Sequence, residues 1–80
     1  MSNVEQGFKN ATGMFREMAV PFWMAVTLLE HGEWLTEQGR SGDARPLLDE
    51  ARGVFEGLRA APWLVRVEKV RSTVGVEASS

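Results

Sequence analysis

Apolar residues recur in steps of three and four, the spacing that keeps side chains on one face of a helix. In residues 3–19 the steps run through Val4, Phe8, Ala11, Phe15 and Met18. Residues 42–59 repeat the spacing at Ala44, Leu48, Ala51, Phe55 and Leu58. The pattern therefore predicts two amphipathic helices with similar faces.

A third helix is predicted over residues 22–38, where no proline interrupts the run after Pro21. The segment Gly39–Gly42 ends it with a glycine C-cap signal and a short loop. Within that loop Ser41 is expected to act as the N-cap of the next helix.

A fourth helix is predicted over residues 62–71, because Pro62 occupies the favoured first-turn position. Residues 72–80 are expected to form a frayed, solvent-facing tail. Short connections make successive helices antiparallel. Residues 1–80 are therefore predicted to form a single all-α domain of about four helices, packed as antiparallel hairpins.

Self-similarity at one fixed offset links the two halves of the chain. Ala11, Gly13, Phe15 and Trp23 recur with the same spacing as Ala51, Gly53, Phe55 and Trp63. Repeats with an offset of this size mark solenoid architectures, whose units bind partners more often than they catalyse reactions.

Residues 28–55 carry a more specific pattern. Its positions are Leu28, His31, Gly32 and Leu35, then Gln38–Gly39, then Ala44, Leu48, Ala51 and Phe55, followed by Leu58. This pattern resembles a tetratricopeptide (TPR) repeat, which implies a fragment of an α–α superhelix. Small residues such as Gly32, Ala44 and Ala51 stand where helices of that family cross closely. The chain departs from the family at Leu28, His31 and Glu56, where Trp, Leu and Pro are usual, and its period exceeds the usual length of about 34 residues.

The long period resembles the C-terminal TPR-like segments of large bacterial ATPase-linked transcription activators and adenylate-cyclase-type signalling proteins. The resemblance implies a non-catalytic protein-binding scaffold. It also implies a groove lined by the first helix of the unit, with candidate residues Val26, Leu29, Glu33, Thr36 and Glu37. Such a groove would suit a basic or amphipathic partner. In the other interpretation Val26 and Leu29 are plain core and both glutamates face solvent.

The composition limits the remaining function classes. The net charge of −2 supplies no excess of cations for nucleic-acid phosphates, so nucleic-acid binding through the last helix is only a third alternative. The absence of cysteine and of a signal-peptide pattern favours the cytoplasm. The apolar run Met18–Leu29 is too short to span a membrane, which takes about 20 residues. A second alternative is a regulatory segment of a multidomain signalling enzyme.

No catalytic or metal-binding pattern is evident in the sequence. His31 is the only histidine, and we expect it to pack between helices with a satisfied nitrogen. Glu30, Glu33 and Glu37 lie on one helix surface, whereas paired catalytic carboxylates straddle a cleft. No enzyme activity, cofactor or metal is therefore predicted.

The first helix would normally pack on a preceding helix that this sequence does not contain. Its face, with Phe8, Phe15 and Met18, is therefore expected to be only partly covered. Exposed apolar area of this kind tends to be sealed by association, so we expect a homodimer that buries this helix. Trp34 is a further candidate for contact with another chain.

Overall fold

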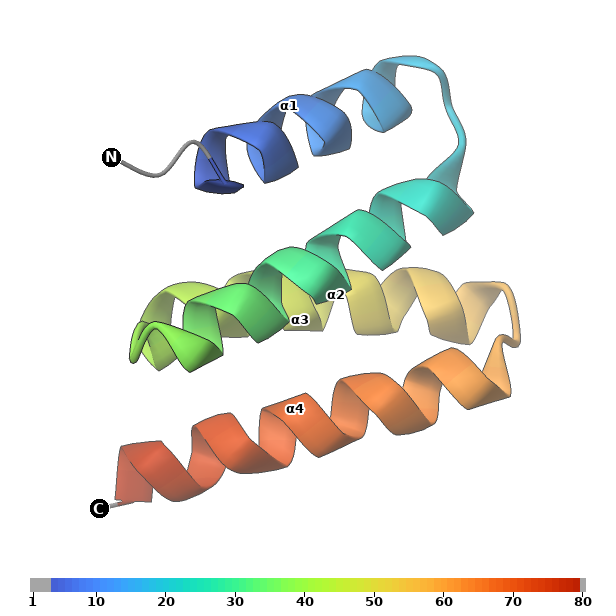
Figure 1. Ribbon diagram of the computed structural model, residues 1–80. Coiled ribbons are helices and arrows are strands. Elements are labelled where there is room, and N and C mark those ends of the chain that lie inside the picture. Colours follow the sequence, from blue (N-terminus) through green and yellow to red (C-terminus); the bar gives the residue numbers. More distant parts are fainter. Residues whose placement is uncertain (1–3, 80) are drawn as a thin grey trace.

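The computed structural model describes the backbone of residues 4–79 and the side chains of residues 4–73. Within residues 4–79 the chain forms four helices and no strand, which confirms the predicted all-α class. The helices are α1 (Val4–Glu17), α2 (Pro21–Glu37), α3 (Ser41–Gly57) and α4 (Ala61–Ser79). Successive helices run in opposite directions, and tight turns join them at alternating edges of the molecule (Figure 1).

The predicted boundaries of the first three helices agree with the structure to within two residues. The prediction that the last helix ends at residue 71 is wrong, because α4 continues through residues 72–79. Residues 72–79 contain no proline, and a single interior glycine costs a helix only about 1 kcal/mol. The Thr73 hydroxyl donates to the Lys69 carbonyl one turn earlier in the same helix, at 3.2 Å. Ser80 lies outside the described residues.

The three turns share one geometry and are evenly spaced along the chain. Ala19, Gly39 and Arg59 have φ of 55°, 75° and 55°, in the left-handed region. In each turn the amide after this residue donates to a carbonyl of the preceding helix, in Phe15, Leu35 and Phe55 respectively. These bonds belong to the Schellman arrangement, which satisfies the last carbonyls of each helix. Helices α1, α2 and α3 therefore end in the same way.

The N-terminus of α3 differs from the prediction. Arg40, not Ser41, is the N-cap residue, and it provides no side-chain capping bond. Ser41 is already helical, and its hydroxyl oxygen is buried without a hydrogen-bond partner among the described residues. After the left-handed Gly39, α3 begins at Ser41, one residue earlier than the start predicted with Ser41 as the N-cap.

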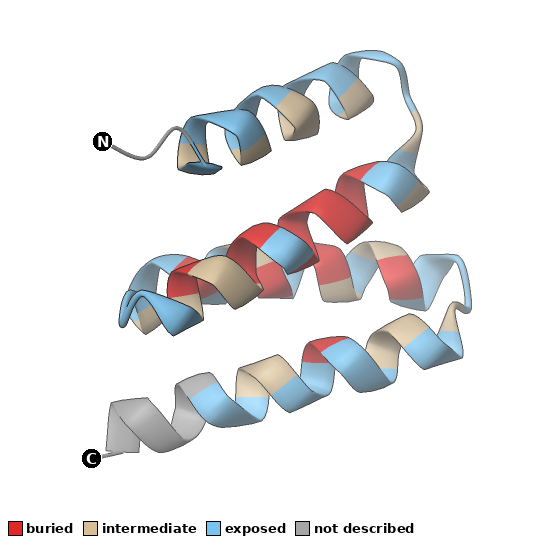
Figure 2. Ribbon diagram, viewed as in Figure 1, coloured by how far each residue is buried: buried red, intermediate tan, exposed pale blue. Residues whose placement is uncertain are grey.

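Helix α2 is the centre of the molecule. It packs against α1, α3 and α4, and nine of its residues are buried, whereas α1 contributes none (Figure 2). Because the shortest dimension is only 16 Å, a helix at the edge keeps one side in solvent. Helices α1 and α4 occupy the two ends of the stack (Figure 1). The fully buried large side chains are Leu29, Leu35, Leu48, Phe55 and Val67.

At Gly32 of α2 the Leu48 side chain of α3 packs directly against the backbone. A Cβ atom at this position would lie 2.7 Å from Cδ2 and 2.9 Å from Cγ of Leu48. Leu48 is fully buried, so it has little room to move aside. The small residue expected at position 32 is therefore required by the helix crossing.

The turn geometry predicts opposite effects for two reciprocal substitutions. Ala19→Gly relieves a left-handed alanine and should raise the free energy of unfolding by about 0.5–1 kcal/mol. Gly39→Ala imposes the same strain and should lower it by about 1 kcal/mol. Urea unfolding followed by circular dichroism measures both. Equal signs for the two variants would contradict the shared geometry.

The helix crossing predicts a second contrast. Gly32→Ala should lower the free energy of unfolding by about 1–2 kcal/mol, because overpacking at Leu48 outweighs the better helix propensity of alanine. Gly53→Ala is the matched control in α3, where an added Cβ meets nothing within 4 Å. It should stabilise the protein by up to about 1 kcal/mol. A stabilising Gly32→Ala would show that α2 and α3 are farther apart.

Candidate functional site

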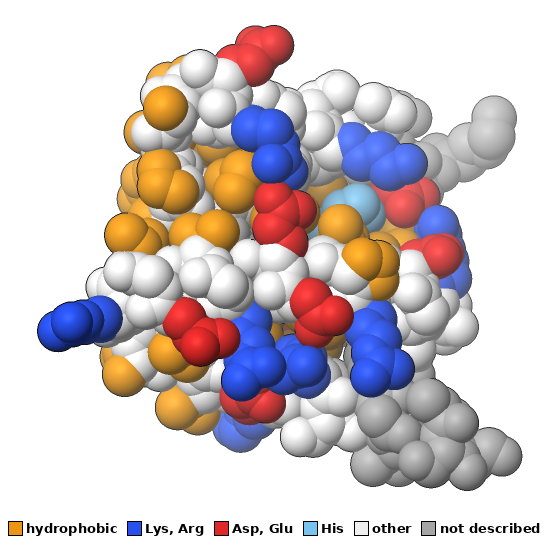
Figure 3. All heavy atoms as spheres, turned by 180° about the vertical axis from the view of Figure 1, so that it is seen from behind, with side chains coloured by type: hydrophobic (Ala, Val, Ile, Leu, Met, Phe, Trp, Pro, Cys, Tyr) orange, Lys and Arg blue, Asp and Glu red, His pale blue; other side chains and the backbone are white. Residues whose placement is uncertain are grey.

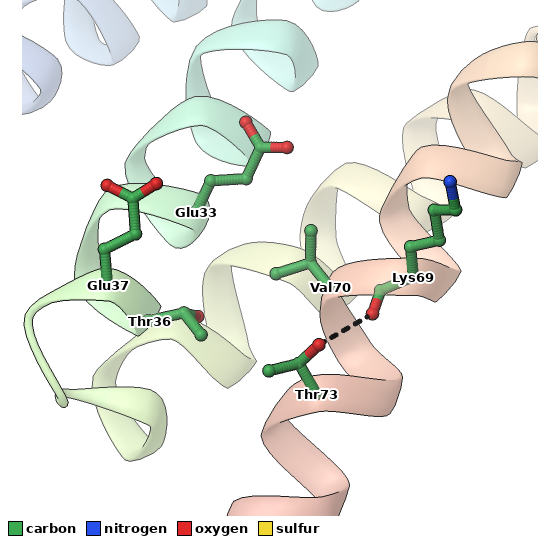
Figure 4. Close-up of a pocket in the computed structure, with 6 residues that line it drawn as sticks. All are labelled: Glu33, Thr36, Glu37, Lys69, Val70 and Thr73. Atoms are coloured by element: carbon green, nitrogen blue, oxygen red, sulfur yellow. Dashed lines mark hydrogen bonds between the residues drawn. The ribbon is translucent and has the colours of Figure 1, made fainter.

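A groove of about 350 Å³ lies between α2 and α4. Glu33, Thr36 and Glu37 line it from α2, and Lys69, Val70 and Thr73 line it from α4 (Figure 4). Both helices are held in place by α3, which contacts each of them more extensively than they contact one another. The groove is therefore a fixed feature of the helix stack.

One end of the groove is closed by an ion pair. Arg66 donates to Glu33 through Nη2 at 2.7 Å and through Nε at 2.9 Å. The Glu33 carboxylate raises the pKa of the Arg66 guanidinium above its usual value. The guanidinium also lies 5.6 Å from the centre of the Trp63 ring, within the range of a cation–π contact. Glu33 is thus committed to a contact within the fold.

The other charged groups of the groove remain open to a partner. Glu37 and Lys69 are exposed, and neither forms an ion pair within residues 4–73. The Thr36 hydroxyl donates to the Gly32 carbonyl at 2.8 Å, so its oxygen is left only as an acceptor. The groove therefore offers an anion, a cation and a short apolar wall at Val70.

The structure divides the residues predicted for the groove. Val26 is 8% exposed and Leu29 is 0% exposed, so the prediction that they line a groove is wrong. They belong to the core because α2 has neighbours on several sides. Glu33, Thr36 and Glu37 do line the groove.

Sequence reasoning missed the residues that α4 contributes to this groove. Lys69 and Thr73 are the counterparts of the predicted groove residues Leu29 and Glu33 in the second copy of the repeat. Applying the repeat offset to the predicted groove helix would have pointed to these α4 positions.

The residues predicted for an interface have different surroundings. Met18 is 60% exposed, whereas Phe8, Phe15 and Trp34 are half-buried. The Phe8 ring stacks on the His31 ring, with centroids 5.1 Å apart. The centroid of the Trp34 ring lies 6.3 Å from that of Phe8. Phe8 and Trp34 thus join α1 to α2 within the chain. Trp23, which recurs in the repeat as Trp63, is 55% exposed.

A polar cluster fastens α1 to the turn between α2 and α3. Glu5 accepts bonds from Nη1 and Nη2 of Arg40 at 3.0 and 3.2 Å. Nε2 of the buried His31 lies 3.3 Å from Oε2 of Glu5, in agreement with the expected packing role of this histidine. The Arg40 guanidinium holds the pKa of the Glu5 carboxyl below its usual value.

Beside this cluster a cavity of about 310 Å³ opens between α1, α2 and α3. The rear view shows the histidine in a hollow bordered by charged side chains (Figure 3). Its rim carries Lys9 and Arg16, but Arg16 is paired with Glu50 at 3.0 Å. The Thr12 hydroxyl oxygen is buried and has no hydrogen-bond partner among the described residues.

The part of the chain that the structure describes contains no group of three or more His, Asp or Glu side chains that could hold a metal ion. Among the same residues no helix is both long and apolar enough to cross a bilayer. Comparisons with protein-family models, with curated proteins and with solved structures found no match for this chain.

The Glu5 cluster predicts a pH-dependent contribution to stability. A carboxyl whose pKa is depressed by folding stabilises the native state above its ordinary pKa, and this effect is lost as pH falls through the depressed value. Glu5→Gln should therefore lower the midpoint of urea unfolding at about pH 7, and the difference from the wild type should shrink toward about pH 3.

Glu17→Gln is the matched control, because Glu17 is an exposed carboxyl on α1 and the charge change is the same. It should leave the midpoint unchanged. Hydrogen exchange provides a second measurement, since amides of α1 should exchange faster in Glu5→Gln alone. Equal destabilisation by both variants would mean that net charge, not the cluster, is responsible.

Proposed function

We propose that this chain is a non-catalytic protein-interaction module with a TPR-like arrangement of helices, and that the groove between α2 and α4 receives a segment of a partner protein. The partner segment is amphipathic, with a cation beside Glu37 and an apolar side chain against Val70. The setting proposed for the module is the cytoplasm of a bacterium, as part of a regulator or as a stand-alone derivative of one.

The observation that carries this proposal is the groove itself. It lies between alternate helices of the stack, and its exposed charges, Glu37 and Lys69, have no ion-pair partner within residues 4–73. Charges that face a groove without internal partners are available to an incoming chain. The close crossing at Gly32 and the repeated turn geometry support the TPR-like part of the proposal.

A regulatory segment of a multidomain signalling enzyme is the second candidate, and the same groove would serve it. Nucleic-acid binding through α4 is less well supported, because its arginines are already neutralised. Arg66 is bound to Glu33, and Arg71 lies 2.9 Å from Glu68 and 3.1 Å from Asp49. Of the basic residues Arg66, Lys69 and Arg71 on this helix, only Lys69 has no ion pair within residues 4–73, which is too few for a salt-dependent interaction of useful strength.

The proposal predicts the charge preference of bound peptides. Selection from a displayed library of helical peptides should return sequences with Lys or Arg next to apolar residues. Glu37→Lys should weaken binding of a selected peptide by about tenfold or more, because it replaces an attraction by a repulsion. Fluorescence anisotropy of the labelled peptide measures this change.

Glu17→Lys is the matched control, since it makes the same charge change on α1, away from the groove. Leu29, which was also predicted for the groove, is not a suitable position for this test, because it is fully buried and Leu29→Glu would disrupt the core. The groove assignment fails if Glu37→Lys and Glu17→Lys weaken binding equally, or if the library yields no binding peptide.

A further inference from the structure

Helix α1 has apolar residues at the same repeat positions that α3 uses for packing, but these residues are less buried than those of α3. Phe8, Ala11 and Phe15 are half-buried, whereas their counterparts in the second copy, Leu48, Ala51 and Phe55, are 0% exposed. Val4 and Met14 are 45% and 51% exposed, whereas their counterparts Ala44 and Val54 are buried and half-buried. Each α1 position is thus more exposed than its α3 counterpart. The outer face of α1, defined here as Val4, Gly7, Ala11, Met14 and Met18, is therefore built for contact with another helix.

The two equivalent tryptophans, Trp23 and Trp63, lie in the first turns of α2 and α4. Trp63 is half-buried against Phe22 of α2 and Phe55 of α3, with ring centroids 5.6 Å away in each case. Trp23 stands at the matching position of α2 and packs edge-on against Phe22, but it is 55% exposed. Hydrophobic side chains gather at the edge of the molecule near the turns that join α1 to α2 and α3 to α4 (Figure 3).

The α4 end of the stack differs chemically from the α1 end. Where α2 has Leu28, Leu29 and Gly32 in its packing face, α4 has Glu68, Lys69 and Ser72. All three α4 residues are exposed. A second molecule stacked head to tail would bury these charges against the apolar face of α1, which is unfavourable. The apolar end is therefore better matched to another copy of itself.

The outer face of α1 is also complementary to itself in shape. Its N-terminal half carries Gly7, where an added Cβ would meet nothing within 4 Å, and its C-terminal half carries the large side chains Met14 and Met18. Two such helices that cross antiparallel at Ala11 place Met14 over Gly7 of the other copy. The same operation places Met18 near Val4.

The border of this face adds no repulsion in that arrangement. Gln6 and Asn10, which are uncharged, lie on the side of α1 turned away from the cluster at Glu5. An antiparallel crossing brings Glu17 toward Gln6 of the other copy, so like charges do not meet. We therefore propose that α1 and Trp23 form the contact surface for a second copy of this chain, related by a two-fold axis near Ala11. This inference does not depend on the groove between α2 and α4.

The size of the contact surface determines how strong dimerisation is expected to be. A helix of 14 residues is only about 21 Å long, whereas stable interfaces bury about 800 Å² per partner. A contact made by one such helix and Trp23 is correspondingly small. We expect dissociation in the micromolar range, with monomer and dimer both populated.

Sedimentation equilibrium tests the proposal directly. The wild type should shift from monomer to dimer as its concentration rises to about 200 µM. Met14→Glu should weaken dimerisation at least tenfold. Val65→Glu is the matched control, because Val65 is 62% exposed on α4 at the other end of the stack. It should leave the equilibrium unchanged.

Disulfide formation tests the antiparallel crossing, and the chain contains no native cysteine to interfere. Ala11→Cys should cross-link to itself under mild oxidation, because the two-fold axis brings the equivalent residues together. Gly7→Cys and Met14→Cys should each cross-link poorly alone but efficiently when mixed. Arg45→Cys, an exposed position on α3, should remain monomeric.

Three results would overturn the proposal. A wild type that stays monomeric at the highest concentration would mean that this face receives a helix of a different protein. A dimer abolished by Val65→Glu and kept by Met14→Glu would place the contact on α4. Self-linking of both Gly7→Cys and Met14→Cys without cross-linking of the mixture would indicate a parallel arrangement.

Discussion

The close packing of α2 against its three neighbours is the constraint on which the rest of the structure depends. Because α2 is contacted by α1, α3 and α4, its apolar residues are not confined to one stripe. Gly32 lets α3 approach closely enough for Leu48 to fill the space where a side chain would stand. In a molecule only 16 Å thick, no other helix is enclosed in this way. Helix α1 packs on α2 and α4 packs mainly on α3, so the groove and the open end follow from the packing of α2 against α3.

The two ends of the stack differ because the repeat is not perfect. The C-terminal copy replaces the apolar packing residues of α2 by Glu68, Lys69 and Ser72, which suits a helix that faces water. The N-terminal copy keeps apolar residues at the packing positions of α1, although Val4 and Met14 remain exposed and the others are only half-buried. Packing the charged positions of α4 against an apolar surface would be unfavourable. Apolar residues are thus exposed at the α1 end and charged residues at the α4 end.

Ion pairs link helices that share little apolar contact. Glu5 joins α1 to the turn at Arg40, Arg16 joins α1 to Glu50 of α3, and Arg66 joins α4 to Glu33 of α2. Exposed pairs contribute little individually, at most about 1 kcal/mol. The pair between Arg66 and Glu33 joins the two helices that line the groove.

The sequence by itself determined the helices, because the three-and-four spacing, the prolines and the turn glycine act within one or two turns of chain. It also determined the repeat, which is read directly from matching residues. Only the tertiary structure decided which helix face is enclosed, because burial depends on neighbours distant in the sequence. Val26 and Leu29 therefore lie in the core although they share a helix with the groove residue Glu37. The partners of Glu5 and Glu33 are likewise a tertiary property, since Arg40 and Arg66 lie far from them in the sequence and reach them only in the folded stack.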